Sequence, residues 1–206
     1  SENVSYELYA VGGLDSGGFS DENGIRKGRE AEYAGAEKLS YTGRIDFHGI
    51  EGLRYGAAFY QGSTDHGKKG ADAAVLGGEV SIVSADFEYE SGAFTLNGLW
   101  AAGSHEGGAS VSAQDFGGYY LTAGYTLWQG NGKFAESSIT PFVRYSVYDT
   151  AENEGGDYER TQITYGVHMP LSEQVCLKLD YQDNSGNGSS VAASDQVNVG
   201  FGFILQ

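Results

Sequence analysis

The chain has 206 residues, of which 33 are glycine and 15 are tyrosine, and its net charge is −16. Glycine at this frequency argues against a mostly helical protein, because each glycine inside a helix costs about 1 kcal/mol relative to alanine. The negative charge argues against nucleic-acid binding through phosphate neutralisation. A single cysteine allows neither an intramolecular disulfide nor a thiolate zinc site. No stretch approaches the ~18 consecutive apolar residues of a transmembrane helix.

Apolar and polar residues alternate along ten segments, which is typical of antiparallel strands with two different faces. In chain order, the predicted strands cover residues 4–11, 38–48, 53–62, 79–90, 94–103, 118–128, 139–148, 160–169, 175–182 and 196–205. In the first strand Tyr6 and Leu8 share the apolar face, and in the last strand Val197 and Phe201 share it. Tyrosines recur on this face, which suits both the aromatic girdle of a membrane barrel and ordinary core packing. The predicted fold class is all-β.

The predicted connections fall into two length classes. The shorter ones cover residues 49–52, 91–93, 129–138 and 170–174, and the longer ones cover 12–37, 63–78, 104–117, 149–159 and 183–195. If consecutive strands pair up and down, the two classes lie at opposite ends. Outer-membrane β-barrels have this asymmetry, whereas a Greek-key sandwich would place a long crossover differently. Because a spanning β-strand needs only ~9–11 residues, we predict a transmembrane, antiparallel up-and-down β-barrel with about ten strands.

Six segments resemble, in order and spacing, segments of the phosphate-selective porin O/P family. They are YELYAVGGLDSGGFSDENGIRKGRE (6–30), LSYTGRIDF (39–47), LRYGAAFYQG (53–62), ITPFVRYSVYDT (139–150), LKLDYQ (177–182) and DQVNVGFGFIL (195–205). The resemblance covers essentially the whole chain, and it implies the C-terminal part of a sixteen-stranded barrel about twice as long.

Two arrangements of the barrel stay open. The chain opens on a strand-like segment without a signal peptide before Ser1, which favours a fragment that lacks N-terminal strands. The other arrangement is a ten-stranded barrel closed by pairing 4–11 with 196–205, because unpaired strand edges are costly in lipid. In both, residues 1–206 are expected to form a single barrel domain.

Charged residues on the polar face are expected to line a water-filled lumen. The four cations and four anions are Arg44, Asp46, Arg54, Asp86, Glu88, Arg144, Lys178 and Asp180. Phosphate selection would require a basic lumen, so this balanced set does not predict it.

The first long connection carries Arg26, Lys27 and Arg29 between glycines. One hypothesis is that it folds into the lumen as a constriction, although a solvated surface loop is favoured. The acidic connection 149–159 could bind divalent cations, but its spacing does not match an EF-hand, and a solvated loop is again favoured.

No catalytic site, metal site or cofactor is expected. The histidines are dispersed without an HExxH pattern, and Cys176 lacks the partners of a nucleophile. We therefore do not expect an enzyme.

The leading functional hypothesis is a porin of the bacterial outer membrane that allows passive diffusion of small hydrophilic solutes or ions. Outer-membrane lipid and lipopolysaccharide would surround it, and no nucleic acid is expected to bind. Pore size, selectivity and association into a homotrimer stay open. The alternatives are a non-conducting structural barrel, for example a sheath for an outer-membrane cytochrome, and a soluble β-sandwich binding module.

Overall fold

The computed structural model describes residues 3–29, 38–64, 77–106, 114–152, 158–186 and 194–204, and its strands all belong to one sheet. The strands are β1 (Val4–Gly12), β2 (Leu39–Ile50), β3 (Leu53–Ser63), β4 (Glu79–Ser91), β5 (Phe94–His105), β6 (Gln114–Tyr125), β7 (Trp128–Gln129), β8 (Ser138–Asp149), β9 (Glu159–Ser172), β10 (Val175–Gly186) and β11 (Gln196–Phe203). The described helices are the single 3-10 turns η1 (Ser16–Gly18), η2 (Arg26–Gly28) and η3 (Gly132–Phe134). None of these described helices is long and apolar enough to cross a membrane.

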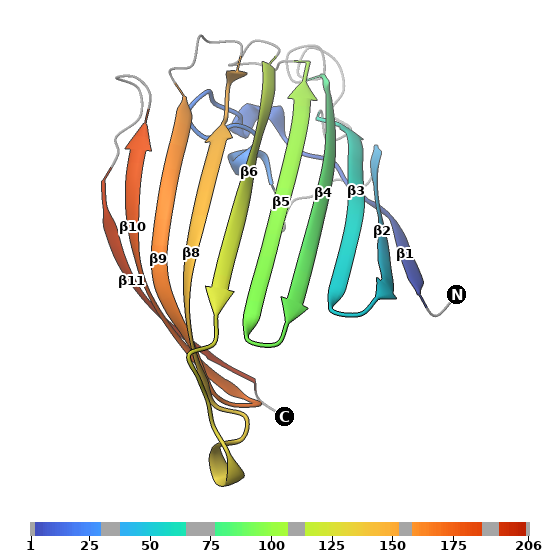
Figure 1. Ribbon diagram of the computed structural model, residues 1–206. Coiled ribbons are helices and arrows are strands. Elements are labelled where there is room, and N and C mark those ends of the chain that lie inside the picture. The colour runs from blue at the N-terminus through green and yellow to red at the C-terminus, as the bar shows by residue number, and fades with distance from the viewer. Residues whose placement is uncertain are drawn as a thin grey trace.

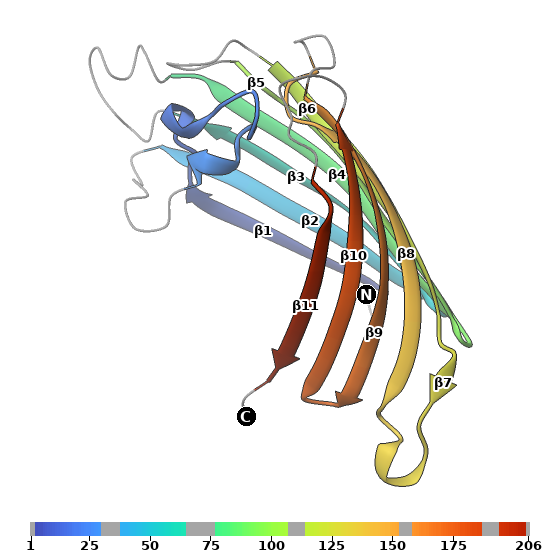
Figure 2. The same cartoon turned by 90° about the vertical axis from the view of Figure 1, so that its left-hand side faces the viewer.

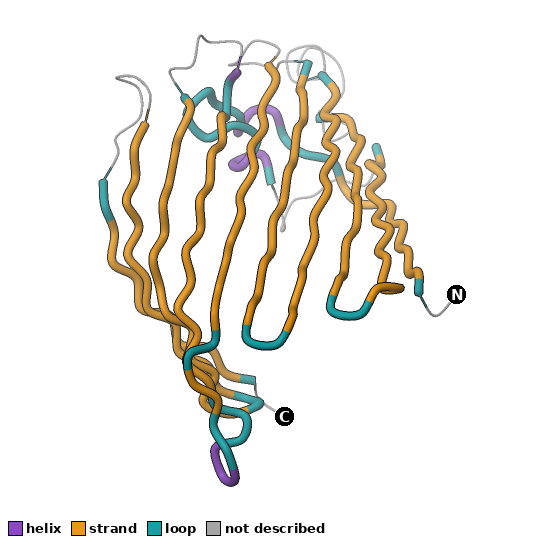
Figure 3. Tube along the Cα trace, viewed as in Figure 1, coloured by secondary structure: helices purple, strands orange, loops and turns teal. Residues whose placement is uncertain are grey.

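The sheet has the up-and-down order that the sequence predicts. Its path runs β1-β2-β3-β4-β5-β6-β8-β9-β10-β11, and each strand is antiparallel to its neighbours. Tight turns join β2 to β3, β4 to β5 and β9 to β10 at the lower end of the sheet in Figures 1 and 3. The connection from β6 to β8 also lies at this end and contains β7, which pairs with β8, and η3. The all-β class and the path of ten long strands are thus confirmed.

The sheet is curved into a trough, as Figures 1 and 2 show. Residues 13–29, with η1 and η2, lie on its concave side near the upper end. Strands β1 and β11 form the two edges, and among the described residues each pairs with one neighbour only. Because direction alternates along the ten-strand path, β1 and β11 run antiparallel to each other. The described strands form an open sheet, so closure into a barrel stays a prediction.

The convex face of the sheet is apolar and exposed, contrary to what a soluble protein shows. Every strand of the path contributes at least one large apolar side chain to it. Examples in chain order are Tyr6, Leu8, Tyr41, Ile45, Tyr55, Phe59, Val83, Tyr89, Trp100, Tyr119, Leu121, Val143, Tyr145, Tyr165, Leu179, Val197, Val199 and Phe201. Among the described residues, the buried apolar side chains are only Phe19, Val80 and Ala151. No second layer of described residues covers the convex face, so the sheet has no globular core there.

The strand predicted over residues 118–128 is the clearest boundary error. The structure begins β6 at Gln114 and ends it at Tyr125, and Trp128 belongs to the separate strand β7. The backbone of Thr126 donates to Ala93 O at 2.8 Å, and that of Leu127 donates to Ile139 O at 3.0 Å. The chain therefore leaves the β5 ladder at Thr126 and continues against β8, although its apolar alternation persists.

Two turn glycines allow a matched test of the lower end of the sheet. Gly52 (φ 71°) and Gly92 (φ 59°) both adopt left-handed backbone, which costs alanine roughly 1 kcal/mol or more. A Cβ at Gly52 would lie 2.2 Å from Glu90 O, whereas one at Gly92 would meet nothing within 4 Å. We expect Gly52→Ala to lower the free energy of unfolding by at least about 1 kcal/mol more than Gly92→Ala does. Urea titration of both variants checks this, and equal losses would contradict the close approach at Gly52.

Candidate functional site

The concave face of the sheet gathers all eight charged residues that the sequence placed together. The strand register aligns Asp46 and Asp86 across Gly56, and it aligns Arg54 directly with Glu88. On the other side of the trough, Arg144 faces Thr122 and Asp180 faces Asn198. The eight residues form three separate groups rather than one ring.

The first group is an ion-pair network on β2, β3 and β4. The Arg44 guanidinium binds both Asp46, at 2.6 and 2.7 Å, and Asp86, at 2.7 and 2.9 Å. Arg54 Nη1 lies 2.9 Å from Asp46 and 3.1 Å from Asp86, and its Nε lies 3.1 Å from Glu88. Each aspartate therefore contacts both guanidinium groups, and such bidentate pairs are the stronger kind of charged hydrogen bond.

The network lies directly over a glycine. A Cβ at Gly56 would come within 2.6 Å of Asp46 Oδ1 and 2.8 Å of Arg44 Nη2. The Asp46 and Asp86 side chains are 17% and 11% exposed, whereas that of Glu88 is 60% exposed. The two aspartates and two arginines thus neutralise one another inside the trough, and only Glu88 extends into solvent.

The second and third groups lie on the opposite wall. Arg144 donates to Thr122 Oγ1 at 2.8 Å, and its guanidinium lies 4.4 Å from the centre of the Tyr120 ring. Lys178 lies 3.2 Å from Asp180, and Asn198 donates to the same carboxylate at 2.9 Å. Lys178 and Asp180 thus form a pair of their own, while Arg144 has an aromatic partner in place of a carboxylate.

Segment 13–29 folds against the concave face. The Phe19 ring is buried and meets His105 of β5 edge-on, with 5.2 Å between ring centres. Asp15 accepts a hydrogen bond from the Gly17 amide at 2.8 Å and caps η1. Phe19 thus anchors residues 13–29 on the concave side of the sheet, whereas Arg26, Lys27 and Arg29 of the same segment are exposed. The constriction hypothesis for these three residues stays a prediction.

Polar contacts fix the tip of the same segment to the far wall. Gln114 of β6 donates to Asp21 Oδ1 at 2.6 Å. The Thr150 hydroxyl donates to Asp21 O at 2.6 Å, and Arg160 of β9 donates to Glu22 O at 2.9 Å. These contacts join residues more than 90 positions apart in the sequence, so alternation within single strands gives no sign of them.

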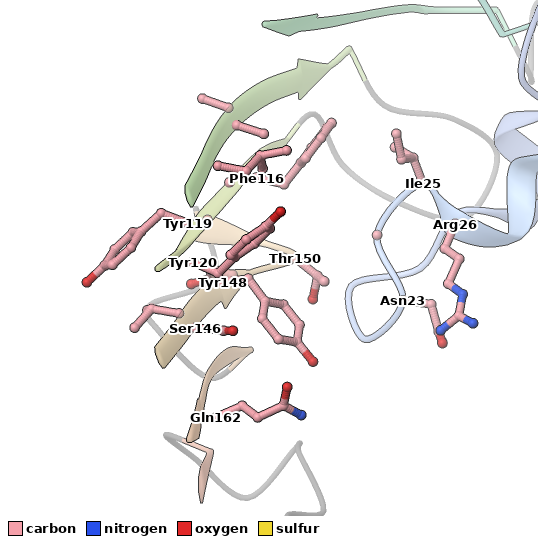
Figure 4. A pocket seen from close by; sticks show the side chains of 18 of the residues that line it. Asn23, Ile25, Arg26, Phe116, Tyr119, Tyr120, Ser146, Tyr148, Thr150 and Gln162 are labelled. Atoms are coloured by element: carbon pink, nitrogen blue, oxygen red, sulfur yellow. The ribbon is translucent and has the colours of Figure 1, made fainter. Parts of the chain in front are cut away.

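A cavity of 670 Å³ separates the segment from the strands (Figure 4). Asn23, Ile25 and Arg26 lie on the segment's side, and the rings of Tyr120 and Tyr148 point toward them from β6 and β8. Further lining residues include Gly24, Arg29, Leu99, Phe116, Ser146, Asp149, Thr150 and Gln162. Of the three basic residues predicted for a constriction, Arg26 and Arg29 line the cavity, and Lys27 does not.

Several parts of the sequence-based predictions lie outside the described residues. They include Glu154 and Asp157 of the acidic connection and Leu205 of the last predicted strand. Within the described ranges, no three histidine, cysteine, aspartate or glutamate side chains are grouped as metal ligands would be.

Comparison with protein-family models and with curated proteins found no match to the chain.

Proposed function

We propose that the chain forms the wall of a bacterial outer-membrane β-barrel, a porin through which small hydrophilic solutes diffuse passively. The observation that carries the proposal is the apolar convex face, which stays exposed on every strand of the path. Soluble proteins rarely expose contiguous apolar patches larger than a few hundred Å². In a bilayer the same face contacts lipid chains, so its apolar side chains are not exposed to water and carry no hydrophobic penalty.

Strand length supports the same proposal. Strands β2, β5, β6, β8 and β10 each have 12 residues. Twelve residues at ~3.3 Å each, tilted by ~45°, rise about 28 Å. That height is close to the ~25 Å apolar band of a transmembrane barrel.

The polar concave face supports a water-filled lumen. Polar residues such as Thr122, Thr164 and Asp180 face the trough. Of the eight charged residues there, all but Arg144 form ion pairs. In lipid the edges of β1 and β11 must be paired, since each open backbone group costs several kcal/mol. Their antiparallel directions permit closure of β1 on β11, and additional strands between them would serve equally. The resemblance of six segments to phosphate-selective porins agrees with this proposal.

A non-conducting barrel is the second candidate, because segment 13–29 occupies part of the trough. In that case the segment acts as a plug, and the barrel has a structural role. Conductance distinguishes the two candidates directly.

The experiment measures single-channel currents of the purified protein in planar lipid bilayers. We expect discrete current steps that heat-denatured protein does not produce. Insertion is checked separately in the Trp128→Phe variant, in which Trp100 on the convex face is the remaining tryptophan. Brominated lipid should quench its fluorescence. Quenching without current would support the plugged barrel, and absence of quenching in the folded protein would overturn the membrane proposal.

A further inference from the structure

The arginines of the chain divide into two sets. Arg44 and Arg54 are held in the ion-pair network. The other four, Arg26, Arg29, Arg144 and Arg160, have no ion pair with any carboxylate of the described residues. Arg26 and Arg29 line the 670 Å³ cavity, whereas Arg144 and Arg160 do not line it but contact Tyr120 and Tyr148, which do. In a chain with a net charge of −16, a cavity lined by two guanidinium groups and one carboxylate, Asp149, with two further guanidinium groups over its rings, is a local site of positive charge that favours an anion.

Each of these arginines either lines the cavity or contacts a ring that lines it. Arg26 and Arg29 belong to its lining, and Arg29 Nε donates to the backbone oxygen of Arg26 at 3.2 Å. Both side chains are exposed. Arg144 lies over the Tyr120 ring, and Arg160 lies 5.6 Å from the centre of the Tyr148 ring. Arg160 also binds Glu22 O, so it positions the segment that carries Arg26 and Arg29.

The opposite wall of the cavity is largely apolar and aromatic, and Ser146, Asp149 and Gln162 add polar groups to it. Tyr120, Tyr148, Phe116 and Leu99 contribute ring and aliphatic surface from β5, β6 and β8. Tyr148 remains 40% exposed, so its ring is accessible to a solute. The cavity volume falls within the ~300–1,000 Å³ typical of small-molecule sites.

We propose that this cavity binds small aromatic carboxylates. The carboxylate would accept charge-assisted hydrogen bonds from Arg26 and Arg29, which offer planar, bidentate donors. The aromatic ring would stack against Tyr148 and Tyr120, whose faces are already polarised by cations. Inorganic phosphate can accept hydrogen bonds from the arginines, but it has no apolar surface to pack against the rings. An aromatic anion can make both contacts and therefore fits the site better. The inference rests on the proposed function only in placing the site along the solute path.

Equilibrium dialysis with radiolabelled benzoate tests the proposal on the folded protein in detergent, without any conductance measurement. We expect saturable binding, at least about tenfold tighter than that of inorganic phosphate or of neutral benzyl alcohol. Arg26→Gln should weaken benzoate binding about tenfold, the effect of losing one charged hydrogen bond. The matched Lys133→Gln, which removes a cation from η3 at the opposite end of the sheet, should not change it.

A second pair of variants tests the aromatic wall. Tyr148→Leu should weaken benzoate binding by about threefold to tenfold, whereas Tyr125→Leu on the convex face should have no effect. Benzyl alcohol binding as tightly as benzoate would overturn the role of the arginines, and phosphate binding as tightly would overturn the role of the rings. Channels without benzoate binding would refute this inference alone, while benzoate binding without channels would refute the porin proposal alone.

Discussion

Arginine in place of Ala85 is expected to cost about 2–4 kcal/mol of folding free energy in a lipid bilayer. Ala85 lies at the middle of β4 on the convex face, exposed and aligned with Ala57 and Trp100. If that face meets lipid, the guanidinium must enter hydrocarbon or bend toward the headgroups. If it meets water, an exposed arginine at this surface position should change stability by no more than about 0.5 kcal/mol.

The neighbouring Ser84 provides the control for this variant. Its side chain points into the trough, where its aligned neighbours are Ala58 and Ala101, so a longer side chain finds space and water. Ser84→Arg should therefore cost much less than Ala85→Arg. Urea titration of both variants in phospholipid vesicles, followed by tryptophan fluorescence, measures the difference. Equal and small costs at both positions would show that the convex face does not contact lipid.

The period of two in the sequence was sufficient to predict the strands and their faces. Side chains of a strand alternate between two faces. Apolar residues two positions or a multiple of two apart, such as Tyr6 and Leu8 or Val197 and Phe201, therefore identify one face without any tertiary information. The same argument correctly placed Arg44, Asp86 and Asp180 together on the other face. The hairpins β2–β3, β4–β5 and β9–β10 follow from short connections, which join antiparallel neighbours, whereas the pairs joined by long connections rest on the expected alternation of long and short loops.

The boundary error at residues 126–128 and the contacts that the sequence did not predict both lie where chain segments distant in sequence meet. Alternation continues through Leu127, but pairing with β8 decides that β6 ends at Tyr125. The inward position of segment 13–29 depends on Phe19 meeting His105 and on Arg160 reaching Glu22. A single sequence contains no signal for such contacts.

The candidate cavity was missed for the same reason. By alternation, Tyr120 and Tyr148 fall on the polar face of their strands, among threonine, serine and glycine residues. A tyrosine at such a position is the local sign in the sequence that a ring lies inside the trough. Which rings face Arg26 is decided by the fold of segment 13–29. The sequence therefore predicted two of the cavity's arginines but not their aromatic partners.

The ion-pair network gives the second large expected effect. Arg44→Leu removes four hydrogen bonds to Asp46 and Asp86 and leaves two adjacent carboxylates sharing Arg54. Exposed ion pairs contribute at most about 1 kcal/mol, and removing one partner of a buried pair costs roughly 3–5 kcal/mol. Because the aspartate side chains are 17% and 11% exposed, an intermediate loss of about 2 kcal/mol is expected.

Two further variants separate the loss of attraction from the repulsion that remains. Arg54→Leu should cost less than Arg44→Leu, because Arg44 still binds both aspartates and the Glu88 side chain left behind is 60% exposed. In Arg44→Leu/Asp86→Asn, one of the two carboxylates loses its charge while Arg54 still binds Asp46 at 2.9 Å. If uncompensated charge causes the loss, the double variant should be more stable than Arg44→Leu in urea titration, with a coupling energy of about 1 kcal/mol. Strictly additive losses would mean that Arg44 stabilises the trough through packing of its side chain over Gly56, and that the aspartates are stable without it.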